Sequence, residues 1–381
     1  MKVDIITDRR RLDALAQEWN GLLAESAADS IFLTWEWVST WLDVVCPNAR
    51  LLVVVIRGAD DRLVAVAPFY HVQMRLVGWI GYRCLRVIGD ENSGGEYVDI
   101  IVRKGFEKES LPLVLQALLQ RGDTWDCMWL PQVAGWTGAH ERFQSLCAGG
   151  HFLTHLRPEG FSSVPLPETY GQYLQSLSRH RRWHIRHDAK KLEASHHVRL
   201  VRCEGAEALS GMLEALFVLH GKHWRSMGEP GSFARRPAMR RFYERLAPTA
   251  LRLGWLRLFG LEVDGIMRAA KYGYAYKGTL FSVQGGYDPD WPGVGSVLMG
   301  RVIQACIDEG IREYDFLGGL SDYKRLWRAA PREGCSLFLG QRSARNLLLF
   351  VPRFKVWPRG RYLNQVETSG AAPPVEAPTR T

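Results

Sequence analysis

The sequence predicts a mixed α/β fold of the α+β kind, built from two similarly ordered halves. Hydrophobic runs rich in β-forming residues alternate with runs of helical spacing along the chain. The order helix, glycine, strand and aromatic–Asp pair occurs at Trp125-Asp126 and again at Tyr314-Asp315, which indicates a degenerate duplication. A glycine-containing loop, Gly293-Val-Gly295, joins a strand to a helix in the second half. The first half lacks this loop, so we expect that it has lost its ligand site and supplies a wall of the cleft.

The whole-chain composition predicts a globular protein with an anionic partner. With 381 residues and 46% hydrophobic content, the chain is long enough for two domains. The net charge of +9 suits a nucleotide cofactor, an RNA or a membrane surface, and composition does not choose among them. No apolar run reaches the about 20 residues that span a bilayer, and the N-terminal residues lack a secretion signal, so we expect a cytoplasmic protein. The seven scattered cysteines have no metal-ligand spacing.

The first half is expected to form a degenerate domain over residues 1–160. Thr34 is a plausible N-cap for a helix. Proline, glycine and serine accumulate over 157–167, where we expect this half to close. Its predicted elements are helices over 10–25, from 35 onward and over 111–120, hairpin strands over 51–57 and 63–71, and strands over 97–102 and 124–130.

The second half, 161–345, is expected to form the chemically active domain. Its strands at 255–261 and 265–274 are joined by a turn at Glu262–Gly265. A strand over 278–284 leads into the glycine loop, a helix over 296–307 follows, and a strand over 313–317 ends the series. Helices are also predicted over 170–177, 179–193 and 206–226.

The C-terminal residues 346–381 form a basic and aromatic segment followed by a tail that we expect to be disordered. Two interpretations stay open for 345–362. Pro352 and Pro358 interrupt an amphipathic helix, which favours a segment packed across the domain. The alternative is peripheral contact with an anionic membrane. Basic and aromatic residues alternate there: Arg345, Phe350, Arg353, Phe354, Lys355, Trp357, Arg359 and Arg361.

The glycine loop is a candidate anion site. Gly293 and Gly295 remove side chains that would block a ligand, and the following helix directs its N-terminus into the loop. The backbone amides expected to hold a phosphate are those of Val294, Gly295, Ser296 and Val297. A third glycine and a Gly-Lys-Ser/Thr sequence are both missing, so the loop is neither a Rossmann nor a Walker A motif. A plain turn that packs helix on strand is the alternative.

Residues 255–327 resemble the core of the GNAT acyl-CoA transferases, with Val294-Gly295-Ser296 at the place of the pyrophosphate loop. Ser178–Glu193 and Tyr314–Trp327 are similar to the signatures of the CelD (BcsL) acetyltransferase group, also termed BioF2-like, which is related to the FemAB aminoacyltransferases. The resemblance implies tandem GNAT-like domains with acetyl-CoA or another acyl-CoA bound to the second. The arginine or glutamine that opens the family's loop is replaced here by Asp290-Trp-Pro292.

Asp315, at the end of a strand facing the predicted cleft, is the first candidate for the general base, ahead of Glu262 and Asp264. A structural carboxylate that accepts from the Gly318-Gly319 amides is an equally open interpretation of Asp315. Lys324 could stabilise an oxyanion or bind an acidic acceptor, and the FemAB resemblance implies an important lysine in this motif. A solvated surface lysine is the alternative.

Tyr323 is the tyrosine assigned to the catalytic set, because a phenol near sulfur can donate a proton to a leaving thiolate. Tyr272, Tyr274 and Tyr287 are further candidates for that acid, although tyrosines more often form core or wall.

One helix carries a basic stripe, which could hold an anionic sugar nucleotide or a lipid-linked acceptor, or could be a solvated face. The stripe consists of Arg179, Arg182, Arg186 and Lys190. His180, His184 and Asp188 recur at four-residue spacing, but without a third histidine or a Glu-x-x-His pattern we expect no metal site.

These patterns favour an N-acyltransferase that moves an acyl group from CoA to an amine acceptor. The acceptor would be a small molecule or a sugar- or lipid-linked precursor of the cell envelope or an exopolysaccharide, reached in the cytoplasm or at the inner face of the membrane. No nucleophile triad is visible, so we expect direct attack by the amine. Two alternatives stay open: a Fem-like transferase that uses aminoacyl-tRNA, and a non-catalytic GNAT-fold protein of polysaccharide assembly. DNA recognition is not expected, because the aromatic residues lie in apolar segments.

Overall fold

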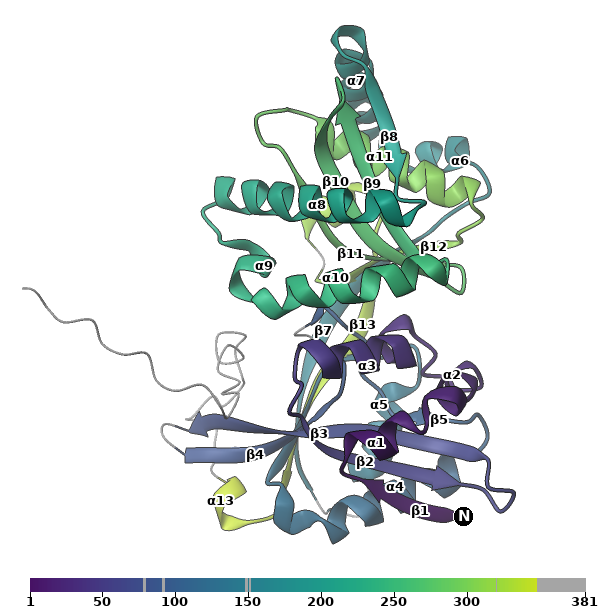
Figure 1. Ribbon diagram of the computed structural model, residues 1–381, viewed down its shortest axis with the longest axis vertical. Helices are drawn as coiled ribbons and strands as arrows, with labels where there is room; N and C mark the ends of the chain where they lie inside the picture. Colours follow the sequence, from purple (N-terminus) through teal and green to yellow (C-terminus); the bar gives the residue numbers. More distant parts are fainter. Residues whose placement is uncertain (78–79, 91–92, 148–149, 151, 320, 348–381) are drawn as a thin grey trace, which may run out of the picture.

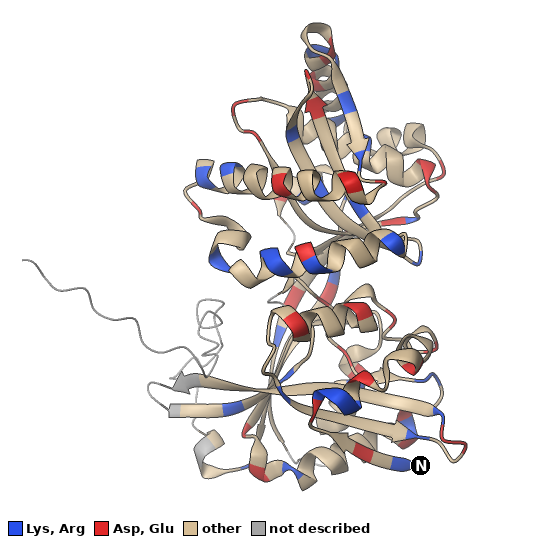
Figure 2. Cartoon of the chain, in the orientation of Figure 1, with Lys and Arg blue, Asp and Glu red and all other residues tan. Residues whose placement is uncertain are grey.

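The computed structural model describes residues 1–77, 80–90, 93–147, 150, 152–319 and 321–347. Segment 345–362, for which two interpretations stay open, therefore lies outside the described residues from 348 onward, as does the tail. No helix of the described residues is long and apolar enough to cross a membrane. Charges of both signs are mixed over both lobes (Figure 2), so the net positive charge is not gathered on one element.

The strands form one mixed sheet that runs through two lobes (Figure 1). Along the sheet their order is β1-β2-β3-β4-β6-β13-β7-β12-β11-β10-β9-β8, and β5 pairs with β3. The strands are β1 (Lys2–Ile6), β2 (Arg50–Arg57), β3 (Leu63–Val77), β4 (Ile80–Val87), β5 (Ile101–Val102), β6 (Cys127–Ala134), β7 (Phe152–Pro165), β8 (Val198–Arg202), β9 (Leu256–Val263), β10 (Ile266–Tyr276), β11 (Thr279–Tyr287), β12 (Glu313–Gly318) and β13 (Ala330–Gln341).

Helices cover the sheet in both lobes. In the second lobe α8 and α10 pack on one face, and α6, α7 and α11 pack on the other. The helices are α1 (Arg9–Asp13), α2 (Ala16–Ala24), α3 (Trp35–Val44), α4 (Glu107–Gln120), α5 (Ala139–Cys147), α6 (Tyr170–Ser176), α7 (Arg179–Ser195), α8 (Ala206–Ser226), α9 (Gly231–Arg235), α10 (Pro237–Arg252), α11 (Val294–Asp308), α12 (Asp322–Leu326) and α13 (Ala344–Leu347), with 3-10 turns at Ile31–Leu33 and Gly122–Thr124.

The two lobes exchange a strand. β7 follows β6 in the chain but pairs antiparallel with β12 of the second lobe. β13 follows β12 but returns to pair antiparallel with β6 of the first lobe. The exchanged strands also pair with each other, from Ala330–Ser163 to Gln341–Phe152. Because each lobe has a parallel strand pair followed by a strand from the other lobe, the topology supports the predicted duplication.

Residues 157–167, where the first half was expected to close, lie largely in β7. Pro158 is tolerated there because β12 pairs with β7 only from Phe161 to Pro165, so this part of β7 has a ladder on one side. The predicted domain boundary at 160/161 falls inside this strand, and the division into domains stays a prediction.

Several local predictions are confirmed. The Thr34 side chain accepts from the Trp37 amide at 3.3 Å and begins α3. The hairpin β9–β10 turns at Asp264 and Gly265, whose φ values of 52° and 77° suit a tight two-residue turn. α8 and the β2–β3 hairpin lie where the pattern indicates. The helix predicted over 10–25 is instead divided into α1 and α2, and the strand predicted over 97–102 is reduced to β5.

An apolar junction joins the lobes around Trp37 of α3. Its ring lies edge-on to Phe242 of α10, with centroids 4.8 Å apart, and to Tyr274 of β10, at 5.7 Å. Its Nε1–H donates to the Gly89 carbonyl at 3.1 Å. Trp37 is fully buried, and the residues of both lobes around it belong to one hydrophobic cluster. The first lobe and the sheet of the second lobe therefore share a hydrophobic core.

The packing of the exchanged strands predicts that alanine substitutions at two glycines have different effects on stability. A Cβ at Gly334 of β13 would stand 2.5 Å from the Val133 carbonyl oxygen and would also contact the Phe161 ring, whereas a Cβ at Gly160 of β7 meets nothing within 4 Å. We expect Gly334→Ala to lower the free energy of unfolding by about 1–3 kcal/mol because of overpacking. Gly160→Ala should be near neutral. Urea denaturation measures both, and equal effects would contradict this account of strand packing.

Candidate functional site

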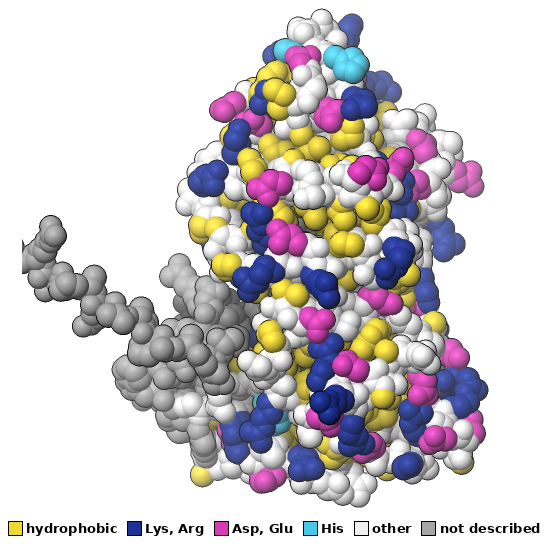
Figure 3. Space-filling view, in the orientation of Figure 1, with side chains coloured by type: hydrophobic (Ala, Val, Ile, Leu, Met, Phe, Trp, Pro, Cys, Tyr) yellow, Lys and Arg dark blue, Asp and Glu magenta, His cyan; other side chains and the backbone are white. Residues whose placement is uncertain are grey.

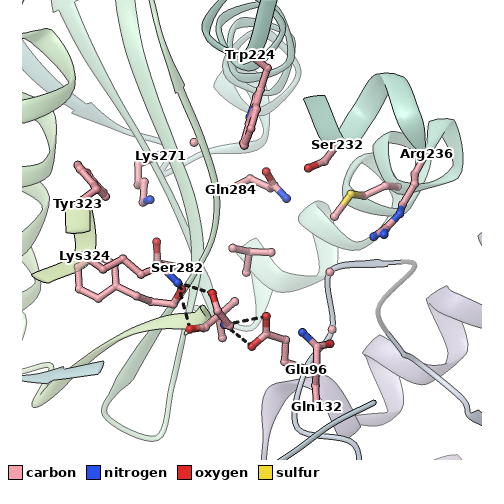
Figure 4. Close-up of a pocket in the computed structure, with 18 of the residues that line it drawn as sticks. Glu96, Gln132, Trp224, Ser232, Arg236, Lys271, Ser282, Gln284, Tyr323 and Lys324 are labelled. Carbon is pink, nitrogen blue, oxygen red and sulfur yellow. Dashed lines mark hydrogen bonds between the residues drawn. The ribbon is translucent and has the colours of Figure 1, made fainter. Parts of the chain in front are cut away.

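The site begins where two parallel strands separate. β11 and β12 pair only from Thr279–Glu313 to Phe281–Asp315. Beyond these residues Ser282–Gly285 of β11 and Phe316–Gly318 of β12 line one cavity of about 460 Å³. Separated strands leave backbone N–H and C=O groups without sheet partners, so a ligand can bond to them. The cavity lies where the first-lobe loop meets the second-lobe sheet (Figure 4).

Asp315 and Leu317 shape the end of β12. Leu317 has a φ of 61°, a conformation that few non-glycine residues adopt. The Asp315 carboxylate accepts from the Leu317 amide at 2.7 Å and stabilises this turn. The turn directs the Gly318 amide toward the first lobe, where it meets Glu96.

Glu96 is the carboxyl group of the cavity. Its Oε2 and Oε1 accept from the Gly318 amide at 2.7 and 3.0 Å. A Cβ at Gly318 would stand 2.9 Å from Oε1, so the close approach depends on a glycine. Burial raises the pKa of Glu96 to about 8, with the charge of Asp315 adding to the rise and the Gly318 amide and Lys324 opposing it.

The first lobe supplies Glu96 through a glycine-rich loop. Gly94 has a φ of 80°, and a Cβ there would be 2.9 Å from Tyr243 Oη and Met239 Cε of α10. Gly94, Gly95 and Gln132 line the cavity beside Glu96, which confirms the prediction that the first half supplies a wall. The sequence analysis missed Glu96 itself. One sequence signal could have indicated it. The glycine-rich segment 89–96 precedes α4, as the second-half glycine loop precedes α11.

Two lysines line the cavity in different states. Lys324 Nζ donates to the carbonyls of residues 316–319 at 2.8, 3.2, 2.5 and 2.8 Å, and so ties α12 to the end of β12. Burial lowers its pKa, while Glu96 and Asp315 oppose that shift. Lys271 lies in β10 and has no hydrogen-bond or ion-pair partner among the described residues. Burial and the nearby charge of Lys324 lower its pKa to about 8.

Asp315, the predicted base, does not line the cavity. Both of its oxygens accept from Tyr97 Oη at 2.9 Å, and Arg332 Nη1 lies 3.8 Å away. Burial raises its pKa to about 6, although the Leu317 amide, Tyr97 and Arg332 oppose the rise. Its partners are therefore those of a structural carboxylate, except that it bonds the Leu317 amide rather than Gly318 or Gly319. Its assignment as base stays a prediction.

The remaining acid and base candidates lie in different places. Tyr323 lines the cavity and is 48% exposed, with its ring 6.4 Å from Trp327. Tyr272 and Tyr274 are buried in the core, where their hydroxyl groups are 2.8 Å apart. The turn residues lie outside the cavity: Glu262 pairs with Arg199 at 2.7 Å and Asp264 with His196 at 2.6 Å.

The predicted anion loop begins α11. Gly293 is the N-cap with a φ of 89°, and its carbonyl accepts from the Val297 amide at 2.9 Å. The Val294 amide donates weakly to Trp291 at 3.4 Å. Among the described residues, the amides of Gly295 and Ser296 have no hydrogen-bond partner, and Ser296 Oγ is a buried atom that also lacks one. Two amides and one hydroxyl are therefore available for a ligand.

Tyr287 connects the loop to the cavity. A Cβ at Gly295 would stand 3.0 Å from the Tyr287 ring. That ring lies 4.2 Å from the ring of His223, which lines the cavity. On the other side a Cβ at Gly293 would stand 3.4 Å from the Asp188 carboxyl carbon. The Tyr287 ring thus packs against Gly295, and a carboxyl group lies beside Gly293.

Asp290-Trp-Pro292, which replace the arginine or glutamine of the GNAT pyrophosphate loop, lie beside a group of charged side chains that pair with one another. Asp288 pairs with Arg268 at 3.1 Å and with Lys222 at 3.2 Å. Arg268 also stacks over Trp291 at 4.5 Å. These contacts hold the entry of the loop from within the protein.

The basic stripe of α7 does not line the cavity. Arg179, Arg186 and Lys190 are exposed, and Arg182 donates to the Gln175 carbonyl at 3.4 Å. Their assignment to substrate binding stays a prediction. His180 and His184 contact each other at 3.0 Å, and the described residues contain no group of three or more potential metal ligands. The space-filling view shows both charges interspersed on its face (Figure 3).

Comparisons with known proteins agree with this architecture. Residues 178–325 match a family model described as an acetyltransferase (GNAT) domain. The crystal structure of FemX is similar over 92% of this chain and 100% of its own, with 12% identity and a TM-score of 0.62. A protein of unknown function from Bacteroides thetaiotaomicron covers 90% and 100%, with 10% identity and a TM-score of 0.55.

A third structure is the C-terminal domain of a protein from Agrobacterium fabrum, named only provisionally as a lysylphosphatidylglycerol synthetase. It covers 89% and 95%, with 10% identity and a TM-score of 0.50. At these identities the likeness shows a shared fold. A search of curated proteins gave no match. The predicted superfamily, the Fem-related fold and the mixed α/β class are confirmed, whereas the CelD grouping stays a prediction.

The environment of Asp315 predicts how stability changes with pH. Its folded pKa of about 6 exceeds the usual value, so its contribution to stability is complete below about pH 4 and is lost as pH rises through 6. Asp315→Asn has no charge to desolvate. The free energy of unfolding of this variant, relative to that of wild type, should therefore rise by up to about 3 kcal/mol between pH 4 and pH 7.

Urea denaturation at pH 5 and pH 7 measures the difference, with the exposed Asp322→Asn as control. If wild type and Asp315→Asn differ in free energy of unfolding by the same amount at both pH values, burial of the Asp315 charge does not carry the assigned cost.

Proposed function

We propose that this chain, whose residues 178–325 form a GNAT acetyltransferase domain, is an N-acyltransferase that moves an acyl group from acyl-CoA to an amine. One observation carries the proposal: β11 and β12 separate at a cavity that has a carboxyl group of raised pKa on its wall. Where the strands separate, their unpaired backbone groups can form hydrogen bonds with a linear acyl donor. A carboxyl group with a pKa near neutrality suits proton removal from an amine.

The residues at the α11 N-terminus fit the diphosphate of CoA. The unpartnered amides of Gly295 and Ser296 and the orphaned Ser296 Oγ offer three donors at the positive end of a helix. When bound, CoA supplies an acyl group activated as a thioester. Acetyl-CoA or a longer acyl-CoA is the proposed donor.

Glu96 is the proposed general base. With a pKa of about 8, it is matched to the proton that an ammonium group must lose before it can attack. The Gly318 amide fixes its carboxylate, and Lys324 acts as a positioning residue that holds the carbonyls around that amide. Tyr323, exposed on the cavity wall, is the proposed proton donor through Oη. The described lining contains no cysteine, and we propose direct attack without an acyl-enzyme.

The proposed acceptor is an amine of a small molecule or of a sugar- or lipid-linked precursor of the cell envelope or an exopolysaccharide. The proposed place of action is the cytoplasm, including the inner face of the membrane. A non-catalytic role in polysaccharide assembly is less favoured, because such a role gives no reason to keep a buried carboxyl group on a solvent-reachable cavity wall.

One observation favours a second candidate, a Fem-like transfer from aminoacyl-tRNA. The Asp188 carboxyl carbon lies 3.4 Å from the Cβ position of Gly293, beside the proposed diphosphate site. A carboxylate there repels a diphosphate, and aminoacyl-tRNA carries singly charged phosphodiesters and no diphosphate. The similarity to FemX supports a fold in common with the protein of that name.

The proposed base predicts a kinetic result. Glu96→Gln keeps the shape and an acceptor oxygen for the Gly318 amide but cannot take a proton, so kcat should fall at least about 100-fold. In wild type, kcat/KM should rise with pH through about 8 as Glu96 ionises. A free-thiol assay with acyl-CoA and a panel of amines measures both. Asp315→Asn is the comparison: if it loses more activity than Glu96→Gln, the base is Asp315.

The proposed donor predicts a binding result. Calorimetry should detect acetyl-CoA or a longer acyl-CoA binding to wild type. Gly295→Trp should reduce the affinity at least about 30-fold, because its side chain meets Tyr287 and covers the amides. Gly211→Trp, at an exposed position of α8 with open space, is the matched control. Asp188→Asn should tighten binding several-fold by removing a negative charge.

No heat with any acyl-CoA, or equal heat from wild type and Gly295→Trp, would overturn the acyl-CoA proposal. Turnover with aminoacyl-tRNA under the same conditions would then establish the second candidate.

A further inference from the structure

Lys271 lies inside the cavity without a partner. It belongs to β10, between β9 and β11, and is paired in register with Gly285. Its side chain runs across that glycine: a Cβ at Gly285 would be 3.1 Å from Lys271 Cδ and 3.5 Å from Nζ. Figure 4 shows the Nζ directed into the space between the two walls. No hydrogen bond or ion pair joins this Nζ to any other residue that the structure describes.

Lysines elsewhere in this lobe show the contrast. Lys222 pairs with Asp288 at 3.2 Å, Lys277 pairs with Asp29, and Lys324 bonds to four carbonyls. Placing an ammonium in a half-buried site without such partners costs free energy, which the lowered pKa of Lys271 reflects. A residue that served only packing could be an uncharged side chain here.

The other charged groups of the cavity leave this lysine uncompensated. Arg236, at the start of α10, lies on the opposite wall, and Lys324 lies on the same side as Lys271 (Figure 4). Glu96 is the carboxyl group among the described lining residues, and it is engaged by the Gly318 amide. His223 and Tyr323 complete the titratable lining. The wall therefore carries an excess of positive charge, which repels a ligand whose only charge is an ammonium.

We propose that Lys271 forms an anion subsite, and that the acceptor is an amine that also carries a carboxylate or phosphate group. This inference rests on the proposed function, because it takes the bound amine to be the acyl acceptor. Binding of the anionic group to Lys271 does not require an acyl donor. The anion neutralises Lys271 and orients the amine toward Glu96. An amine of similar shape without the anionic group lacks this anchor.

The test uses matched pairs of amines that differ in one anionic group. The pairs are glucosamine 6-phosphate against glucosamine, and 6-aminohexanoate against hexylamine, so that the two arms separate phosphate from carboxylate. Direct binding is measured by calorimetry without donor. Wild type should bind the member with an anionic group at least about 10-fold more tightly than its partner without one, and Lys271→Met should lose that preference. Lys108→Met, an exposed change in α4, is the control.

A pH series separates an anion-binding role from a structural one. Lys271 is charged below its pKa of about 8, so wild-type affinity for 6-aminohexanoate should be full at pH 7 and fall about 10-fold by pH 9. Lys271→Arg stays charged and should hold its affinity. Glu96 has a similar pKa, and its ionisation weakens anion binding in the same direction. The series is therefore run in the Glu96→Gln background, where the Lys271 contribution remains alone.

Three outcomes would overturn the inference: equal binding of the members of both pairs by wild type, an unchanged preference in Lys271→Met, or the same pH slope in Lys271→Arg. If anionic amines bind as expected and no acyl-CoA is turned over, the subsite stands and the proposed reaction fails. If turnover occurs and Lys271→Met lowers kcat equally for amines with and without the anionic group, Lys271 acts in the chemistry and the subsite assignment fails.

Discussion

The site depends on the point at which β11 and β12 stop pairing. Past Phe281 and Asp315 the strands diverge, and the positive φ of Leu317 sends the Gly318 amide toward the first lobe. The bond from the Leu317 amide to Asp315 and the four carbonyl bonds of Lys324 stabilise this turn. Without it, continued ladder pairing would occupy the backbone groups that now face the cavity. Asp315 and Lys324 thus act on the shape of β12, and Glu96 and Lys271 provide the charges that face the cavity.

The first lobe has the same strand separation but fills it. β4 and β6 pair in parallel only at Cys84–Cys127 and Leu85–Met128. The next residues along these strands are Arg86 and Trp129, and the guanidinium lies over the indole at 4.7 Å. Arg86 also pairs with buried Asp90 at 2.6 Å. At the corresponding place in the second lobe, β11 continues with Ser282, a small residue that lines the cavity. Side chains and a buried ion pair therefore fill, between β4 and β6, the place that is open between β11 and β12.

Sequence patterns predicted the local parts of this architecture well. Thr34 as a cap, the Asp264–Gly265 turn and the glycine at the start of α11 are determined by residues close in sequence, so they could be recognised. The exchange of β7 and β13 could not, because strand pairing depends on residues far apart in the chain. Glu96 was missed for the same reason: its partner Gly318 belongs to the other lobe.

The spacing of charges left one question open. Arg179, Arg182, Arg186 and Lys190 share a helix face, but spacing alone does not say whether a face meets a cavity or solvent. Lys271, in contrast, lies in a strand whose other cation, Arg268, is paired with Asp288, and it has no periodic signal. What distinguishes it is the surrounding space, which only the assembled sheet defines.

The strand exchange also limits how the cavity can change shape. Glu96 comes from one lobe and Gly318 and Lys271 from the other, so a hinge between the lobes would separate the proposed base from the proposed acceptor site. Two features oppose such a hinge: the antiparallel β7–β13 ladder that crosses between the lobes, and the buried Trp37 packed on Phe242 and Tyr274. Opening either would break backbone hydrogen bonds or expose a fully buried indole. The β7–β13 ladder and the Trp37 junction therefore keep Glu96 beside Gly318.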